Sequence, residues 1–540
     1  MYYLLPRRTW FHDVFTDLAG QLRWSYLPPL MVYLAYGISG LTAIVGTFFT
    51  KEYLGLSAAF LAGLTFWAAI PWTLKMPLGH LIDLIWRWKS FLVYLGSFLV
   101  ATSLGIMYAL ITYTDQLKQI MSVEAWYVSS VLLSAVGFVI QDVVADAMTV
   151  EAVHPTDRDG NRYSDETLRK MHVTMQTLGR FALISGLVLV AMLNIFMFSG
   201  IETMSTADKA EVYAQIYLIA LFIPLISVSG VIIAHILTTG RAKRLKGLGY
   251  SAEQIKEFTD FAPQDTSPNW WILGGGLVFV IFTLSMGTAD IAFSQEIIFL
   301  GSMGIVLFLM SKLIQELPKV QARALVGTAI IIFIFRATPS PGAGATWFEI
   351  DILKFDQQFL SVLSLITSCL TLVGIIALRP MMANRSIAYI VVFLTFAAGI
   401  LSLPNIGLFY GLHEWTSVWS NGVIDARFIA ILDTAIESPL GQIAMIPMLA
   451  WIAKNAPSHL KATFFAVMAS FTNLALSAGH LGTKYINQIF IVSREVKGEV
   501  PVAADYSQLG VLLITVTLIT VIMPLIAIFI IQWSPFRTQE

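Results

Sequence analysis

The chain has 540 residues, of which 57% are hydrophobic and 12% are charged, and its formal net charge is −1. Its mean hydropathy is +0.74, and apolar runs of about 20 residues recur along it, each long enough to cross about 30 Å of hydrocarbon. These values exclude a soluble domain and indicate a polytopic membrane protein. The balanced charge gives no reason to expect a nucleic-acid partner.

The first 26 residues contain charges and no apolar core of the length that a signal peptide needs. Their apolar residues recur with helical spacing, which predicts an interfacial N-terminal segment, 1–26. The apolar runs after it predict about 14 transmembrane helices. We place them near 28–49, 56–78, 90–112, 124–150, 167–198, 210–237, 270–290, 295–315, 322–343, 355–379, 386–404, 421–453, 461–490 and 508–533.

The basic residues sort by loop and therefore indicate the orientation. They gather at the loops and helix ends that face the cytoplasm if the N-terminus does, Arg87, Arg158 and Arg241 among them. Both termini are then cytoplasmic, and the plasma (inner) membrane is the expected location. The only cysteine, Cys369, lies in an apolar run, so no disulfide within the chain and no cysteine metal site are expected.

When one tightly connected helical pair is set aside, six predicted spans remain before it and six after it. Six spans in each of two halves is the number expected for a transporter built from two repeats. We predict an N-terminal six-helix half at 27–237, a cytoplasmic linker at 238–269, an inserted hairpin at 270–318 and a C-terminal six-helix half at 319–540. No nucleotide-binding motif is present, and no cofactor or metal is expected.

Two carboxylates, Asp142 and Asp146, lie four residues apart on one face of the fourth predicted span. Each costs about 2.5 to 3.5 kcal/mol at such a depth, so a buried ion pair, a substrate site or a proton path is expected. Arg180, near the middle of the fifth span, is the expected counter-ion. One arginine neutralises only one carboxylate, so the other would carry a proton. The structural alternative makes Asp146 a partner of a neighbouring helix or of Lys75.

The second span ends in Lys75-Met76-Pro77-Leu78-Gly79-His80-Leu81-Ile82-Asp83, with Arg87 and Lys89 close behind. Gly-x-x-x-Asp followed by basic residues resembles the loop between spans two and three of the major facilitator superfamily. A closer resemblance, to the folate-biopterin transporter family of that superfamily, rests on five ordered pieces. They are Tyr36-Gly37-Ile38-Ser39-Gly40-Leu41 with 49–58, Pro71-Trp72-Thr73-Leu74-Lys75, Asp142-Val143-Val144-Ala145-Asp146-Ala147, Phe335-Arg336-Ala337-Thr338-Pro339-Ser340, and Ala462-Thr463-Phe464-Phe465-Ala466 with Asn473-Leu474. Lys461 and the predicted hairpin depart from the family pattern.

The resemblance implies the major facilitator fold, with spans 28–49, 124–150, 322–343 and 421–453 around a central cavity. We therefore assign substrate binding to Arg336, Asp433, Glu437 and Tyr36, proton coupling to Asp142, Asp146 and Arg180, and conformational gating to Lys75, Gly79, Asp83 and Arg87. Arg336 would grip an anionic group; its alternative is an ion pair with Asp433 or Glu437. For Asp433 and Glu437, the structural alternative is an ion pair with Arg427 or Arg336. Pro339 and Pro341, with Gly342 and Gly344, predict a helix break just after Arg336.

The leading functional hypothesis is a secondary active transporter that moves an organic solute, an anionic pterin- or folate-like compound, by alternating access with proton coupling. Its partners are then a small organic solute, protons and the lipid bilayer, and the monomer is the default state in the superfamily. A muropeptide or acyl-CoA-type permease of the same superfamily is the alternative. From other classes, an intramembrane enzyme and a non-transporting structural membrane protein remain open, and solute uptake separates all of these.

Overall fold

Helices make up almost all of the computed structural model, which describes residues 23–50, 57–73, 75–154, 156–157, 160–259, 268, 270–288, 291–315, 317–377, 385–440, 461–494 and 503–537. Within this part of the chain, the β-structure consists of two isolated bridges, Thr156 with Arg162 and Ser493 with Asp505. The predicted all-α class is confirmed. Most of the predicted interfacial segment 1–26 lies outside the described residues.

The helices before residue 260, which we call the N-terminal group, include four short 3₁₀ elements marked η. They are η1 (Trp24–Tyr26), α2 (Leu27–Ile38), η2 (Ser39–Thr42), α3 (Ala43–Phe49), α4 (Ala58–Thr73), α5 (Lys75–Leu84), η4 (Trp86–Trp88), α6 (Lys89–Thr112), α7 (Thr114–Lys118), α8 (Val123–Ala152), α9 (Asp165–Met197), η5 (Ile201–Thr203), α10 (Thr206–Ala220), α11 (Phe222–Gly247) and α12 (Ala252–Thr259).

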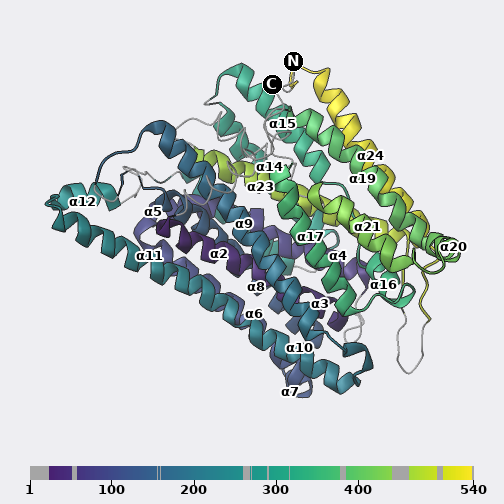
Figure 1. Ribbon diagram of the computed structural model, residues 1–540. Coiled ribbons are helices and arrows are strands. Elements are labelled where there is room, and N and C mark those ends of the chain that lie inside the picture. Colours follow the sequence, from purple (N-terminus) through teal and green to yellow (C-terminus); the bar gives the residue numbers. More distant parts are fainter. Residues whose placement is uncertain are drawn as a thin grey trace, which may run out of the picture.

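A helical pair, α13 (Trp270–Thr288) and α14 (Ser294–Ile314), separates these from the C-terminal group. That group consists of α15 (Lys319–Arg336), α16 (Ala343–Asp351), α17 (Gln357–Ala377), α19 (Ile387–Phe409), α20 (Leu412–Trp419), α21 (Ala426–Glu437), η6 (Ser438–Leu440), α23 (Lys461–Ile489) and α24 (Leu509–Gln532). Figure 1 shows α12 at one end of the long helix α11, with α7 and α10 near its other end.

Nine stretches of the described residues are long and apolar enough to cross a membrane. They are Trp24–Phe49, Trp86–Thr112, Val123–Thr149, Leu178–Met197, Asp208–Gly247, Ser294–Lys312, Gln357–Gly374, Ile387–Phe409 and Leu509–Gln532. The span predicted at 322–343 ends early, because α15 ends at Arg336. Within the run predicted at 56–78, α4 and α5 lie on either side of residue 74, which is outside the described part. The run predicted at 421–453 continues past η6 into residues outside the described part.

The predicted helix break after Arg336 is confirmed. Helix α15 ends at Arg336, and α16 begins after Gly342, whose φ of 79° suits a residue without a side chain. A difference appears in the predicted linker, because α11 continues to Gly247 instead of ending near 237. Its last turns contain Arg244 and Lys246, and basic side chains stabilise the C-terminal end of a helix.

Close helix packing within the N-terminal group depends on small residues. Helix α6 packs along α8, and a Cβ atom added to Gly96 would lie 2.6 Å from the carbonyl oxygen of Gly137. A Cβ added to Gly137 would lie 2.7 Å from the carbonyl oxygen of Gly96. The two backbones therefore touch at a depth where apolar side chains would hold them apart. This contact fixes α8, the helix that carries Asp142 and Asp146.

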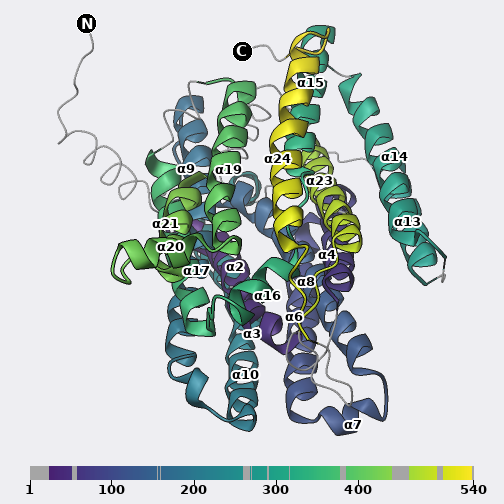
Figure 2. The ribbon, with the colours of Figure 1, turned by 90° about the vertical axis from the view of Figure 1, so that its right-hand side faces the viewer.

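The two groups of helices meet along two main contacts. Helix α4 packs against α23, and α9 packs against α17. Helices α13 and α14 lie together at one side of the bundle (Figure 2). They contact both groups, since α13 packs on α5 and α14 packs on α23.

Candidate functional site

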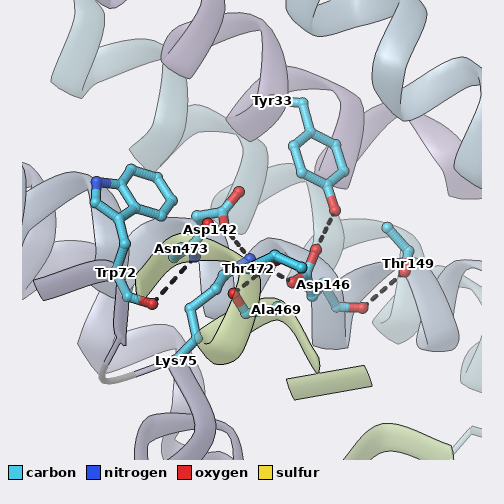
Figure 3. A network of polar contacts seen from close by, with 9 residues as sticks. All are labelled: Tyr33, Trp72, Lys75, Asp142, Asp146, Thr149, Ala469, Thr472 and Asn473. Atoms are coloured by element: carbon cyan, nitrogen blue, oxygen red, sulfur yellow. Dashed lines mark hydrogen bonds and ion pairs between the residues drawn. The ribbon is translucent and has the colours of Figure 1, made fainter. Parts of the chain in front are cut away.

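Lys75, Asp142 and Asp146 form the central polar cluster of the molecule. Asp142 and Asp146 lie one turn apart on α8, and Lys75 is the first residue of α5. The Lys75 ammonium forms ion pairs with Asp142 and with Asp146, the second at 3.1 Å. Tyr33 of α2 donates a hydrogen bond of 2.6 Å to the other oxygen of Asp146 (Figure 3). The side chains of Lys75 and Asp142 are 15% and 10% exposed, whereas that of Asp146 is 52% exposed.

The C-terminal group reaches this cluster through α23. Asn473 donates a hydrogen bond of 3.2 Å to the backbone carbonyl of Trp72, the residue that lies three positions before Lys75 (Figure 3). The Lys75 ammonium lies 5.9 Å from the centre of the Trp72 ring. Helix α23 therefore contacts the end of α4 that adjoins the lysine.

Lys75, rather than the expected Arg180, makes the ion pairs with the two carboxylates. The structural alternative in which Asp146 bonds to Lys75 matches this geometry. Arg180 still interacts electrostatically with Asp142 and Tyr36. Its side chain is exposed although it lies on a long apolar helix, α9. Depth along a helix was visible in the sequence, but the direction in which each side chain points across the bundle was not.

Arg336 approaches Arg180 from the C-terminal group. The two guanidinium groups are near enough for their charges to repel each other. Arg336 lies at the C-terminal end of α15, where the helix break prevents the chain from covering it with a further turn. Two arginines from opposite groups of helices thus lie near each other.

A cavity of about 530 Å³ lies between the N-terminal group and α16. Tyr36, another predicted site residue, lines it. Its other aromatic walls include Trp72, Tyr127, Phe138 and Trp347, of which Trp347 belongs to the C-terminal group. Residues with hydroxyl groups also line the cavity, among them Thr42, Thr47, Ser103, Ser130 and Ser134. The cavity combines flat apolar surfaces with hydrogen-bonding groups.

The predicted acids of the C-terminal group lie elsewhere. Asp433 is 6% exposed and accepts a hydrogen bond of 3.1 Å from Asn405 on α19. Glu437 lines a second cavity, of about 360 Å³, between α9, α17 and α21. Arg427, which was considered as an ion-pair partner for these acids, instead pairs with Asp356 at 2.8 Å.

The predicted gating residues divide between two places. Lys75 belongs to the central cluster, and Gly79 lies one turn later on α5. Arg87 is exposed within η4, and the side chain of Asp83 lies outside the described part. The ion pair beside this loop belongs instead to Lys89, which is 8% exposed and lies 2.5 Å from Glu151 at the end of α8.

Three side chains make polar contacts at or beside this cluster without having been predicted from the sequence: Tyr33, Lys89 and Glu151. Tyr33 precedes Tyr36 by three residues, so both lie on one side of α2, and this spacing was a usable signal. Glu151 stands five residues after Asp146 in the same charged stretch. The ion pair with Lys89 depends on the packing of α6 against α8, which single-sequence patterns do not contain.

Comparison with known proteins agrees with this architecture. The model of the BT1 family matches residues 36–537. A curated relative, the folate-biopterin transporter of Synechocystis sp. (strain ATCC 27184 / PCC 6803 / Kazusa), is 22% identical over 462 residues, which cover 84% of this chain and 72% of the relative. The resemblance stated from the sequence motifs is confirmed.

Two solved structures show the same fold. A POT family transporter in complex with 5-aminolevulinic acid has a TM-score of 0.57 at 12% identity, with 96% of this chain and 97% of that chain covered. The nucleoside transporter NupG has a TM-score of 0.51 at 9% identity, with 95% and 100% covered. The chain therefore shares the all-helical fold of these transporters, and at these identities the likeness concerns the fold alone.

Proposed function

The chain belongs to the BT1 family and is a membrane transporter rather than an enzyme. We propose that it moves an anionic pterin- or folate-like solute by alternating access and that a proton accompanies the solute. The curated relative is named a folate-biopterin transporter, which supports this solute class. The cavity of about 530 Å³ carries the proposal, because its aromatic walls and hydroxyl groups suit a flat heterocycle with polar edges.

The positive charges near the centre support the anionic character of the proposed solute. Lys75, Arg180 and Arg336 bring three positive charges, whereas Asp142 and Asp146 bring two negative ones. A solute carboxylate that binds Arg336 and Arg180 would relieve the repulsion between them and join the two groups of helices.

Proton coupling is proposed for Asp146. Lys75 contacts both carboxylates, but one ammonium neutralises one of them. Asp142 is the more buried and makes the closer contact with Lys75. Asp146 is the more exposed and already receives a hydrogen bond from Tyr33, so it is the carboxylate that a proton from water reaches.

Uptake into proteoliposomes tests the proposal. The purified chain is expected to accumulate radiolabelled folate and biopterin when an inward proton gradient is imposed, and to lose the accumulation when an ionophore collapses the gradient. A dipeptide and a nucleoside serve as control solutes, since transporters of both kinds share the fold. Uptake of either control with exclusion of both pterin compounds would refute the proposed solute class.

A further inference from the structure

Arg494 is a buried arginine at the boundary between the two groups of helices. It lies shortly after α23 and is 5% exposed. Its guanidinium donates a hydrogen bond of 3.4 Å to the backbone carbonyl of Thr50, which directly follows α3. It also lies 5.6 Å from the centre of the Trp347 ring on α16. Arg494 therefore ties the C-terminal group, to which it belongs, to the end of α3 in the N-terminal group.

Both contacts of Arg494 are with residues that line the cavity of about 530 Å³. Thr50 comes from the N-terminal group and Trp347 from the C-terminal group, and both are buried. Tyr33, which contacts the central polar cluster, lies about 25 Å before Thr50 along the stretch Trp24–Phe49, at 1.5 Å per residue. Arg494 therefore joins the two groups at the end of the cavity that is remote from this cluster.

The C-terminal group holds Arg494 in place. Ser493, the preceding residue, exchanges backbone hydrogen bonds of 3.0 and 2.8 Å with Asp505. Val492 packs so closely on Gly344 of α16 that a Cβ atom added to this glycine would lie 2.9 Å from the Val492 side chain. The position of the arginine is therefore fixed relative to α16, and its bond to α3 reports how the two groups are arranged.

The bond across the boundary can break without leaving the arginine unpaired. Its acceptor in the N-terminal group is a neutral carbonyl, and no described carboxylate of that group forms an ion pair with Arg494. Within its own group, Arg494 interacts electrostatically with Asp351, whose carboxylate also accepts a hydrogen bond of 2.5 Å from Tyr506. Separating a buried ion pair would strand a charge, whereas here the counter-ion moves with the arginine.

We propose that Arg494 is a gate residue. Its bond to Thr50 closes the cavity at the end remote from Lys75, and loss of this bond opens the cavity toward that face of the membrane. This inference rests on the proposed function, since such a gate is needed only if the two groups move by alternating access. The bond from Asn473 to Trp72 joins the same groups near the other end, so a solute in the cavity lies between two contacts that can open in turn.

A cysteine inside the cavity reports on the gate. Gly46 lines the cavity, and a Cβ atom added to it meets no atom within 4 Å, so a cysteine fits there. The chain is purified in detergent with Cys369→Ser, so that a bulky maleimide reaches both faces. We expect Arg494→Ala to speed the labelling of Gly46→Cys by about fivefold or more, because a hydrogen bond from a charged donor no longer holds the closed arrangement.

Two variants set the scale of this effect. Arg494→Lys keeps the charge and should speed the labelling less than Arg494→Ala does. Arg427→Ala is the matched control, since Arg427 also donates to a backbone carbonyl, at 3.1 Å, but to that of Lys354 within its own group. It should leave the labelling rate of Gly46→Cys unchanged.

A cross-link tests the same contact while keeping it closed. Thr50→Cys and Arg494→Cys, joined by a cleavable thiol cross-linker about as long as an arginine side chain, should stop uptake of biopterin into proteoliposomes, and a reductant should restore it. Each single variant, treated with the same reagent, should not respond to the reductant.

These measurements separate failure of the gate from failure of the proposed function. An unchanged labelling rate in Arg494→Ala, or undiminished uptake by the cross-linked chain, would overturn the gate and leave the proposed function standing. If the wild-type chain takes up no pterin compound, the proposed solute class is refuted, and the labelling rates, which need no solute, still decide the gate.

Discussion

At the scale of single residues, the ion pairs of Lys75 define what each carboxylate can do. Asp142 is buried against the lysine, so its loss would leave a buried ammonium with one partner fewer, and we expect damage to folding. Asp146 is half exposed and also held by Tyr33, so its neutral form keeps a hydrogen-bonding partner. The two aspartates of one motif therefore differ in role because their burial differs.

We predict that Asp146→Asn keeps solute exchange and loses accumulation. Counterflow needs no net proton movement, so its rate should stay within about twofold, whereas pH-driven accumulation should fall by about tenfold or more because no proton is carried. Uptake and counterflow of labelled solute in the same proteoliposomes measure both. Asp208→Asn, an exposed acid on α10, is the matched control. Normal accumulation by Asp146→Asn would exclude it as the proton carrier.

Arg336→Lys should distinguish charged from uncharged solutes. Lysine keeps the positive charge but loses the planar fork that holds a carboxylate at two points. We expect the KM for folate, which carries carboxylates, to rise about tenfold, while the KM for uncharged biopterin changes little. Arg323→Lys, an exposed position on the same helix, is the control. An unchanged KM for folate would show that Arg336 does not grip the anionic group.

His154, beyond the end of α8, should make stability depend on pH. Burial, together with Arg241 and Arg23, lowers the pKa of His154 to about 4 from the usual 6.5. Between these values the unfolded chain binds the proton and the folded chain does not, so stability is lost as pH falls from 6.5 toward 4. In detergent, the fall in Tm over this range should be smaller by a few degrees in His154→Gln than in the exposed control His235→Gln. Equal falls in both variants would contradict this assignment.

At the scale of helices, hydropathy predicted most bounds closely. The run at 90–112 corresponds to α6 and the run at 167–198 to α9. An unbroken apolar stretch that crosses a membrane forms a helix because its backbone groups must hydrogen-bond to one another. The helix break after Arg336 could also be predicted from the sequence, because two prolines and a glycine with positive φ disrupt a helix without help from distant residues. The ion-pair partner of Asp142 and Asp146 could not be predicted from the sequence. Lys75 and Arg180 are both basic residues near the depth of the two carboxylates in the membrane, and only the packing of α5 on α8 selects between them.

The pair α13 and α14 packs on one side of the bundle, where it shares an apolar cluster with α15 and α23. Val306, Leu309 and Met310 of α14 are buried in one apolar cluster with residues of α15 and α23. Glu296 at its start accepts hydrogen bonds from Lys484 at 3.1 Å and Tyr485 at 2.5 Å. The pair therefore stabilises α23 against the helices around it.

Removing 270–315 should consequently lower stability more than selectivity. We expect a reduced yield of folded protein and a lower Tm, with the ratio of KM values for folate and biopterin unchanged, because neither described cavity is lined by this pair. Glu296→Gln is a milder version that should lower Tm by a smaller amount. Wild-type stability with a changed KM ratio would place the pair in the solute path.

At the scale of the whole molecule, the distribution of basic residues predicts which face is cytoplasmic, and the structure supplies two reporters for it. Lys256 on α12 and Lys118 on α7 are both exposed and lie outside the long membrane helices. In Figure 1 the elements that carry them lie at different ends of the bundle. Cys369, the only cysteine, is exposed and must first be replaced by serine.

In that background, we predict that a membrane-impermeant maleimide labels Lys118→Cys in intact cells and labels Lys256→Cys only after the membrane is permeabilised. The reason is the excess of arginine and lysine at the ends of α9 and α11 that adjoin α12, which disfavours moving this face across the membrane. Each variant is the other's control, since both replace an exposed lysine on a short helix. If Lys256→Cys were labelled from outside intact cells, the orientation of the chain would be the opposite of the predicted one. Asp146 would then receive a proton from the cytoplasm only while the cavity is open toward the opposite face.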